Sequence, residues 1–157
     1  MMVERKANQE AGFNGSERRR QCLRQAACLL GASDEMASSF EAEGVIVMEG
    51  FPLHMISMVR GDGPWVACMK LPRPEGVNEA AWSDSLLVAN GLTMMAEDWA
   101  FGLEEDGDGV LLMLLPGDLW DARLLAARLE GMLSMCRSVT AGADTMRSML
   151  SSTESQA

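Results

Sequence analysis

Tyrosine is absent from this chain of 157 residues, and histidine occurs only once, as His54. A Ser-His-Asp or Cys-His catalytic arrangement needs a histidine base, and His54 lies within a predicted strand, beside Met55 and Ile56. A structural histidine is the favoured interpretation. We therefore expect the protein not to be an enzyme.

The sequence also lacks recognisable metal and phosphate motifs. Its four cysteines have no CxxC spacing, and Cys22 and Cys28 are six positions apart on a predicted helix, which places them on different faces. The acidic turn over residues 104–109 lacks the spaced ligands and final glutamate of an EF-hand loop, so an ordinary Asp-Gly hairpin suffices. Gly61-Asp62-Gly63 does not continue into a phosphate-binding loop. We expect no metal ion and no cofactor.

Positive charge is scarce: Lys and Arg number 13 against 23 Asp and Glu, a net charge of −10. Between Pro74 and Ala122 there is no Lys or Arg at all, while eleven acidic residues occur. Binding to a phosphate backbone needs clustered basic side chains, so nucleic acid is excluded as the expected partner. The acidic stretch is interpreted as a solvated face or, alternatively, as a surface that attracts a basic or amphipathic polypeptide.

Long apolar runs are missing as well. The first 15 residues contain no apolar core of a signal peptide, and the longest uncharged stretch, Ser85–Ala96, is 12 residues. Spanning a bilayer takes about 20 apolar residues. We expect a cytoplasmic protein without membrane insertion.

What is present fits one ordinary domain, with 48% hydrophobic and 23% charged residues. The polar, aperiodic residues 1–15 predict a flexible N-terminal arm. Residues 16–139 contain the periodic segments and form the predicted domain. Residues 140–157, which follow with Gly142 near their start, predict a C-terminal tail with at most a short helical turn before disorder.

Three helices and five strands are predicted. The first helix begins near Asn14 or Ser16 and ends at Gly31, the second is capped by Asn78, and the third runs from Asp118 to Val139. Short apolar segments bounded by turn residues predict the strands, at residues 44–50, 53–60, 64–71, 98–104 and 109–115. Their short links require antiparallel pairing. The expected fold is α+β, in the order α-β-β-β-α-β-β-α with a twisted antiparallel sheet.

Two of these strands are apolar on both faces. Val45 and Val47 point opposite to Ile46 and Met48, and residues 65–69 behave similarly. A sheet with one face in water should alternate apolar and polar residues, and three helices can hardly cover both faces of five strands. We therefore expect self-association, a polypeptide ligand, or both, to cover the remaining face.

The sequence resembles the class I chaperones of bacterial type III secretion, the Tir-chaperone (CesT-like) family, over roughly residues 17–137. The resemblance is most specific over residues 86–133, in the helix end LLVAN, the strands WAFGLEEDG and VLLMLLP, and the leucine-rich closing helix. Earlier in the chain, CLLG followed by a loop and three strands is similar to the family's sheet entry. The Arg-rich start of the first helix and the 14 methionines depart from the pattern.

The resemblance implies an ATP-independent homodimeric chaperone. It would bind N-terminal segments of secreted effector proteins, keep them competent for export and deliver them to the secretion apparatus, including its ATPase. The alternative is a small regulatory or adaptor protein that uses the same fold without exporting cargo.

The resemblance places the dimer contact on the second helix and the strand after it. The apolar residues expected there are Trp82, Leu86, Ala89, Trp99 and Phe101.

Cargo is expected at the first helix and the first strands, where an effector strand can add to a free sheet edge. Leu23, Ala27 and Leu30, with Val45 and Val47 predicted across from them, are the candidates, together with Met48, Met55 and Met58. The alternative for the helix stripe is that it belongs to the core of the domain. Methionine adapts to irregular partners, so a general chaperone for several effectors is one interpretation, and simple replacement of Leu and Ile in the core is the other.

Overall fold

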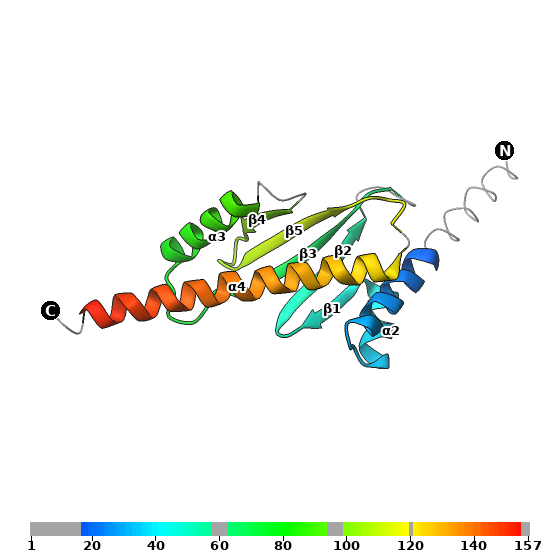
Figure 1. Cartoon of the computed structure of the whole chain (residues 1–157), viewed down its shortest axis with the longest axis horizontal. Coiled ribbons are helices and arrows are strands. Elements are labelled where there is room, and N and C mark those ends of the chain that lie inside the picture. The colour runs from blue at the N-terminus through cyan, green and yellow to red at the C-terminus, as the bar shows by residue number, and fades with distance from the viewer. Residues whose placement is uncertain (1–16, 58–62, 94–98, 120, 155–157) are drawn as a thin grey trace, which may run out of the picture.

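The five strands form one antiparallel sheet, in the order β1-β2-β3-β5-β4. The structure, a computed structural model, describes residues 17–57, 63–93, 99–119 and 121–154 (Figure 1). Within these ranges the α+β fold predicted from the sequence is confirmed. The strands are β1 (Val45–Met48), β2 (Phe51–Ser57), β3 (Trp65–Leu71), β4 (Trp99–Leu103) and β5 (Gly109–Leu115).

Helices lie along one face of the sheet and at its two ends (Figure 1). The N-terminal helix (residues 17–29) and α2 (Asp34–Glu43) lie at the β1 end, and α3 (Glu79–Thr93) packs beside β4. The longest helix, α4 (Ala122–Glu154), runs across the sheet and past α3. No helix in the described ranges is both long enough and apolar enough to cross a bilayer.

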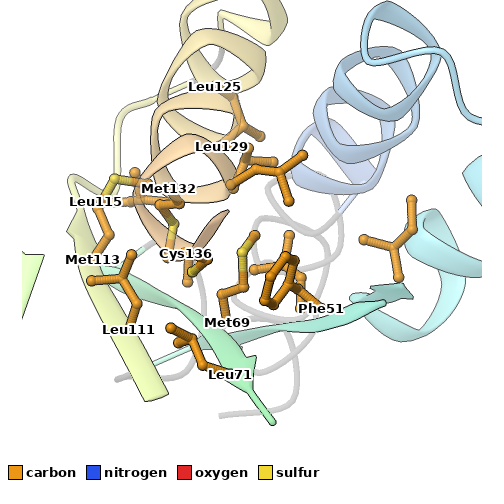
Figure 2. Close-up of a cluster of buried hydrophobic side chains, with 14 of the residues drawn as sticks. Phe51, Met69, Leu71, Leu111, Met113, Leu115, Leu125, Leu129, Met132 and Cys136 are labelled. Carbon is orange, nitrogen blue, oxygen red and sulfur yellow. The ribbon is translucent and has the colours of Figure 1, made fainter. Parts of the chain in front are cut away.

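The core forms between α4 and the inner face of the sheet (Figure 2). Alternate residues of β3 and β5 point inward, and Met69, Leu111 and Met113 are fully buried there. Helical spacing brings Leu125, Leu129, Met132 and Cys136 of α4 onto these strands. Burying a side chain of this size stabilises the fold by about 1.5–3 kcal/mol.

The N-terminal helix is fixed to the sheet by a buried arginine. The Arg19 guanidinium stacks over the Trp65 ring, 4.8 Å from its centroid, and donates to the carbonyl of Gly63 and, at 3.4 Å, to Ser57 Oγ. The predicted end of this helix is confirmed, since Gly31 has a φ of +84°. Its predicted start lies outside the described residues.

Helix α2 was not predicted and corrects the expected order to α-α-β-β-β-α-β-β-α. Ser33 caps it by accepting a hydrogen bond from the Met36 N–H at 3.2 Å, and Gly44, with a φ of +67°, ends it. Only Ala37 and Phe40 of its ten residues are buried, which is too few for an apolar period to be visible in the sequence.

Helix α4 differs from its prediction at both ends. Asp121, not Asp118, caps it, accepting from the N–H groups of Arg123 at 2.9 Å and Leu124 at 3.3 Å. The helix continues past Val139 to Glu154, so most of the predicted C-terminal tail is helical. Gly142 costs a helix only about 1 kcal/mol relative to alanine, and Ala143, 2% exposed, packs in the core cluster.

The first hairpin turns two residues earlier than predicted. Glu49 and Gly50 form the turn with φ angles of 52° and 83°, and the predicted linker Phe51–Pro52 belongs to β2. The other predicted strands are found, and the predicted cap of α3 is confirmed, because Asn78 Oδ1 accepts from the Ala81 N–H at 2.8 Å.

Candidate polypeptide-binding surfaces

The sheet face opposite α4, called the outer face below, is apolar and open. The strand register places Val47, Ile56 and Leu114 on it, with exposed fractions of 51%, 49% and 47%. The described helices pack on the inner face, so the residues that the structure describes leave the outer face uncovered, as the strand pattern predicted.

The two edges of the sheet are chemically different. Strand β4 forms one edge, and the Asn90 side chain of α3 closes it at Phe101. Asn90 Nδ2 donates to the Phe101 carbonyl at 2.8 Å, and the Phe101 N–H donates to Asn90 Oδ1 at 2.6 Å. Both backbone groups of the central residue of β4 are thereby satisfied.

Strand β1 forms the other edge. The Met55 N–H donates to the Gly44 carbonyl at 2.8 Å, and hydrogen-bonded pairs alternate along an antiparallel ladder. The pairs Val45–His54 and Val47–Pro52 are therefore the non-bonded ones, so the backbone groups of Val45 and Val47 point away from β2. Within the described part of the chain, no strand pairs with this side of β1.

A hollow of about 190 Å³, called the β1 hollow, lies between β1, α2 and the middle of α4. Its apolar wall includes Leu30, Met36, Ile46 and Leu133, and Glu49 and Glu130 stand at its border. Arg137 joins these two carboxylates, with Nε 2.7 Å from Glu49 and Nη2 3.1 Å from Glu130.

The surroundings of the β1 hollow are acidic. Residues 25–59 contain no Lys or Arg, while α2 and the first turn contribute five carboxylates in this span, at Asp34, Glu35, Glu41, Glu43 and Glu49. Two of them are paired, Glu41 with Arg24 at 2.9 Å and Glu49 with Arg137 at 2.7 Å, and three carboxylates exceed the paired charges. The local excess of negative charge favours a partner that carries positive charge.

A second hollow, called the α3 groove, has a volume of about 530 Å³. Val88 and Leu92 of α3 form one wall, and Met135, Val139 and Ala143 of α4 form the other. Leu87, Val88 and Leu92 are 65%, 67% and 70% exposed, the most exposed large hydrophobic side chains among the described residues.

The residues predicted for the dimer contact are largely buried within the chain, although Ala89 also lines the α3 groove. Trp82, Leu86, Ala89 and Phe101 are buried within the chain, between 0% and 6% exposed, and Trp99 is half-buried. Gly109 lies under Trp82 and Leu86, which would approach a Cβ at that position to within 3.1 and 3.2 Å. The predicted stripe of α3 therefore faces its own sheet, and the outward stripe is Leu87, Val88 and Leu92.

The residues predicted for cargo divide into three groups. Leu23 and Ala27 are core residues, 5% and 0% exposed, so they are not available as surface contacts. Leu30 and Met48 are half-buried on the β1 hollow, and Met55 is half-buried against the core.

Val45 and Val47 point to the outer face, so the predicted packing against Leu23 and Ala27 is wrong, and Ile46 points inward instead. Met58 lies outside the described residues.

Groups with catalytic potential are not gathered at these surfaces. His54 is exposed on the outer face, and the described residues contain no group of three or more His, Cys, Asp or Glu that could hold a metal ion. Burial raises the pKa of the Cys136 thiol to about 12, and it also raises the pKa values of Cys22 and Cys68. These three thiols are protonated at neutral pH.

Comparisons with known proteins identify the fold. No family model matches the sequence, and no curated protein matches it. The structure is similar to a chain in the solved HopA1-SchA chaperone-effector complex, with a TM-score of 0.58, 15% identity, and coverage of 80% of this chain and 94% of that chain. At this identity the likeness shows a common fold.

Proposed function

We propose that this protein is a chaperone of type III secretion that binds an extended segment of a secreted effector and carries out no catalysis. One observation carries the proposal: the open edge of β1 lies directly beside the β1 hollow, which has an apolar wall and two carboxylates at its border. The similar fold in a chaperone-effector complex supports it, and so does the sequence resemblance to the CesT-like family.

The geometry suggests how a segment would bind. An extended chain beside β1 would bond to the outward N–H and C=O groups of Val45 and Val47. Successive side chains of a strand point to opposite sides, so alternate residues would enter the β1 hollow and the others would lie beside Val47 on the outer face. Backbone bonds would supply affinity, and the hollow would select the side chains.

Charge suggests the composition of the segment. With no Lys or Arg between residues 25 and 59, an apolar segment with basic flanks would be attracted, and one with acidic flanks repelled. Binding should therefore weaken as salt concentration rises.

We propose a homodimer as the working form, joined through the α3 groove. The exposed Leu87, Val88 and Leu92 of α3 form an apolar ridge beside the α3 groove. The ridge of each copy could therefore pack into the groove of the other around a twofold axis. Two further parts of the proposal rest only on the resemblance to the CesT-like family. These are the preference for N-terminal regions of effectors and their delivery to the secretion ATPase.

The first experiment identifies partners and then tests the edge. Proteins that co-purify with the tagged chain are identified, and peptides covering the first 100 or so residues of each are titrated against wild type and two variants. Val47→Pro removes an outward N–H without breaking the ladder to β2, since proline is tolerated where an edge N–H faces solvent. Val47→Thr keeps that N–H and the branched shape.

We expect Val47→Pro to fold, to keep the wild-type assembly state and to lose at least tenfold in affinity, while Val47→Thr binds like wild type. Equal binding by both variants would exclude strand addition at β1. Partners that are not secreted, bound with the same edge dependence, would instead indicate the regulatory or adaptor role.

A further inference from the structure

The closed β4 edge points to a role for Asn90 that does not depend on the identity of any cargo. Backbone groups that point outward from β4 alternate with those bonded to β5, so Trp99, Phe101 and Leu103 present theirs to the free side. Asn90 bonds both groups of the middle residue, at 2.8 and 2.6 Å. Its amide therefore offers one donor and one acceptor, as a residue of a neighbouring strand would.

The amide is held in place by the packing of α3. Ala89, the preceding residue, is 5% exposed, and Thr93 Oγ1 donates to the backbone carbonyl of Asn90 at 3.1 Å. One turn earlier, Leu86 packs over Gly109, whose missing side chain lets the helix approach the sheet. The packing of α3 therefore holds the Asn90 side chain beside Phe101, at the middle of the β4 edge.

Without the Asn90 amide, the free edge of β4 would be prone to pair with another strand. Its five residues, WAFGL, are uncharged and rich in aromatic and aliphatic side chains, and Leu103 is 44% exposed. An uncharged edge of this kind pairs readily with another strand. A second copy would offer an identical β4 edge, with which β4 could pair around a twofold axis.

We propose that Asn90 is an edge-closing residue: it prevents β4 of two copies from pairing and leaves β1 as the single edge at which an extended chain can add. Residue 90 touches no cargo in this arrangement and acts through the backbone of Phe101. Each chain would accordingly take one added strand rather than two.

The test uses the full chain and three single variants. Asn90→Ala removes both hydrogen bonds, and Asn90→Asp keeps an acceptor for the Phe101 N–H but cannot donate to the Phe101 carbonyl at neutral pH. Asn78→Ala is the matched control, because it removes a side-chain hydrogen bond of 2.8 Å from the same helix without exposing β4. Melting temperature, light scattering and amide hydrogen exchange are measured for each.

We expect Asn90→Ala to raise the exchange rate of the Phe101 amide about tenfold and to assemble beyond the wild-type state as concentration rises. Asn90→Asp should give a smaller increase in assembly, and it also provides the measurement if Asn90→Ala does not fold. Asn78→Ala should remain in the wild-type state even where its melting temperature falls equally.

A double variant decides whether β4 pairing causes the assembly. In Asn90→Ala with Leu103→Pro, the outward N–H of residue 103 is gone, so the edge is blocked again and the wild-type state should return. Assembly that persists in the double variant, or that occurs equally in Asn78→Ala, would overturn the proposal. An unchanged assembly state in folded Asn90→Ala and Asn90→Asp would overturn it as well.

Discussion

The side chain of Asn90 bonds both backbone groups of Phe101, eleven residues further along the chain, at 2.8 and 2.6 Å. No comparable contact closes β1 among the described residues, where Val45 and Val47 direct their backbone groups outward. The sheet therefore has one closed and one open edge, which gives a polypeptide partner a single direction of approach.

Amide hydrogen exchange should report this difference directly. The Val45 and Val47 amides should exchange at least tenfold faster than the Phe101 amide, because only the latter donates to an intramolecular acceptor. Adding a cargo peptide should slow exchange at Val45 and Val47 and leave Phe101 unchanged. Protection of Val45 and Val47 in the unliganded protein, measured by NMR, would contradict the open edge.

A charge in the α3 groove should separate the two copies of the proposed dimer. Leu92→Glu places a carboxylate at a site that is 70% exposed in the single chain, so the variant should fold normally and raise the dimer dissociation constant at least 100-fold. Sedimentation velocity at micromolar concentration measures the change. Ala127→Glu adds the same charge at an exposed position of α4 outside the groove and should remain dimeric.

Leu86→Asp tests the corrected assignment of α3. Leu86 is 4% exposed, so a carboxylate there would be buried in the core of the chain, and we expect a loss of about 3–5 kcal/mol in unfolding free energy. Urea denaturation followed by tryptophan fluorescence measures it. A stable, folded Leu86→Asp that is merely monomeric would restore the original prediction for this residue.

Two glycines with equal space around them should respond oppositely to alanine. Neither Gly142 nor Gly31 has an atom within 4 Å of an added Cβ, but Gly31 has a φ of +84° and Gly142 lies within α4. Gly142→Ala should stabilise the protein by about 0.5–1 kcal/mol, and Gly31→Ala should destabilise it by about 1–2 kcal/mol. No gain for Gly142→Ala in thermal denaturation would indicate that α4 does not persist at this position.

Lys70 should contribute to stability only where its partners are ionised. Its Nζ lies 2.5 Å from Asp106 and 3.1 Å from Glu104, and the contact lowers the pKa of Asp106 below its ordinary value of 3.8. A carboxyl whose pKa is lowered by folding stabilises the protein above its unfolded pKa and loses this contribution as pH falls through the folded value. The melting temperatures of wild type and Lys70→Met should therefore differ near pH 7 and converge as pH falls through the lowered pKa of Asp106.

The strands were predictable because their signals are local. Alternating or continuous apolar residues between Gly, Pro and Asp turns mark all five segments. Links of two to four residues fix antiparallel pairing among the first three strands and between the last two, but no short link predicts that β3 pairs with β5. Helix α2 was not predictable from periodicity, since Ala37 and Phe40 are its only buried residues. Its cap Ser33, the acidic first turn and the stop at Gly44 were the available signals.

The faces were harder to predict than the elements. Helix α3 has two apolar stripes, and only the position of Gly109, in a strand that comes later in the chain, decides that Trp82 and Leu86 face inward. Similarly, both faces of β1 are apolar, so the sequence cannot tell whether Val47 or Ile46 faces the helices. In each case the deciding contact joins residues far apart in sequence, which no local pattern encodes.

The length of α4 has a consequence for the proposed dimer. Leu133 lines the β1 hollow, and Met135 and Val139 line the α3 groove, so one helix carries both surfaces, with Val139 about 9 Å beyond Leu133 along its axis. If two copies join through the α3 groove, the length of α4 between the two surfaces fixes the separation between their open β1 edges. An effector that engages both copies must then carry two strand-forming stretches joined by a connector of sufficient reach, so connector length becomes a selection criterion in its own right.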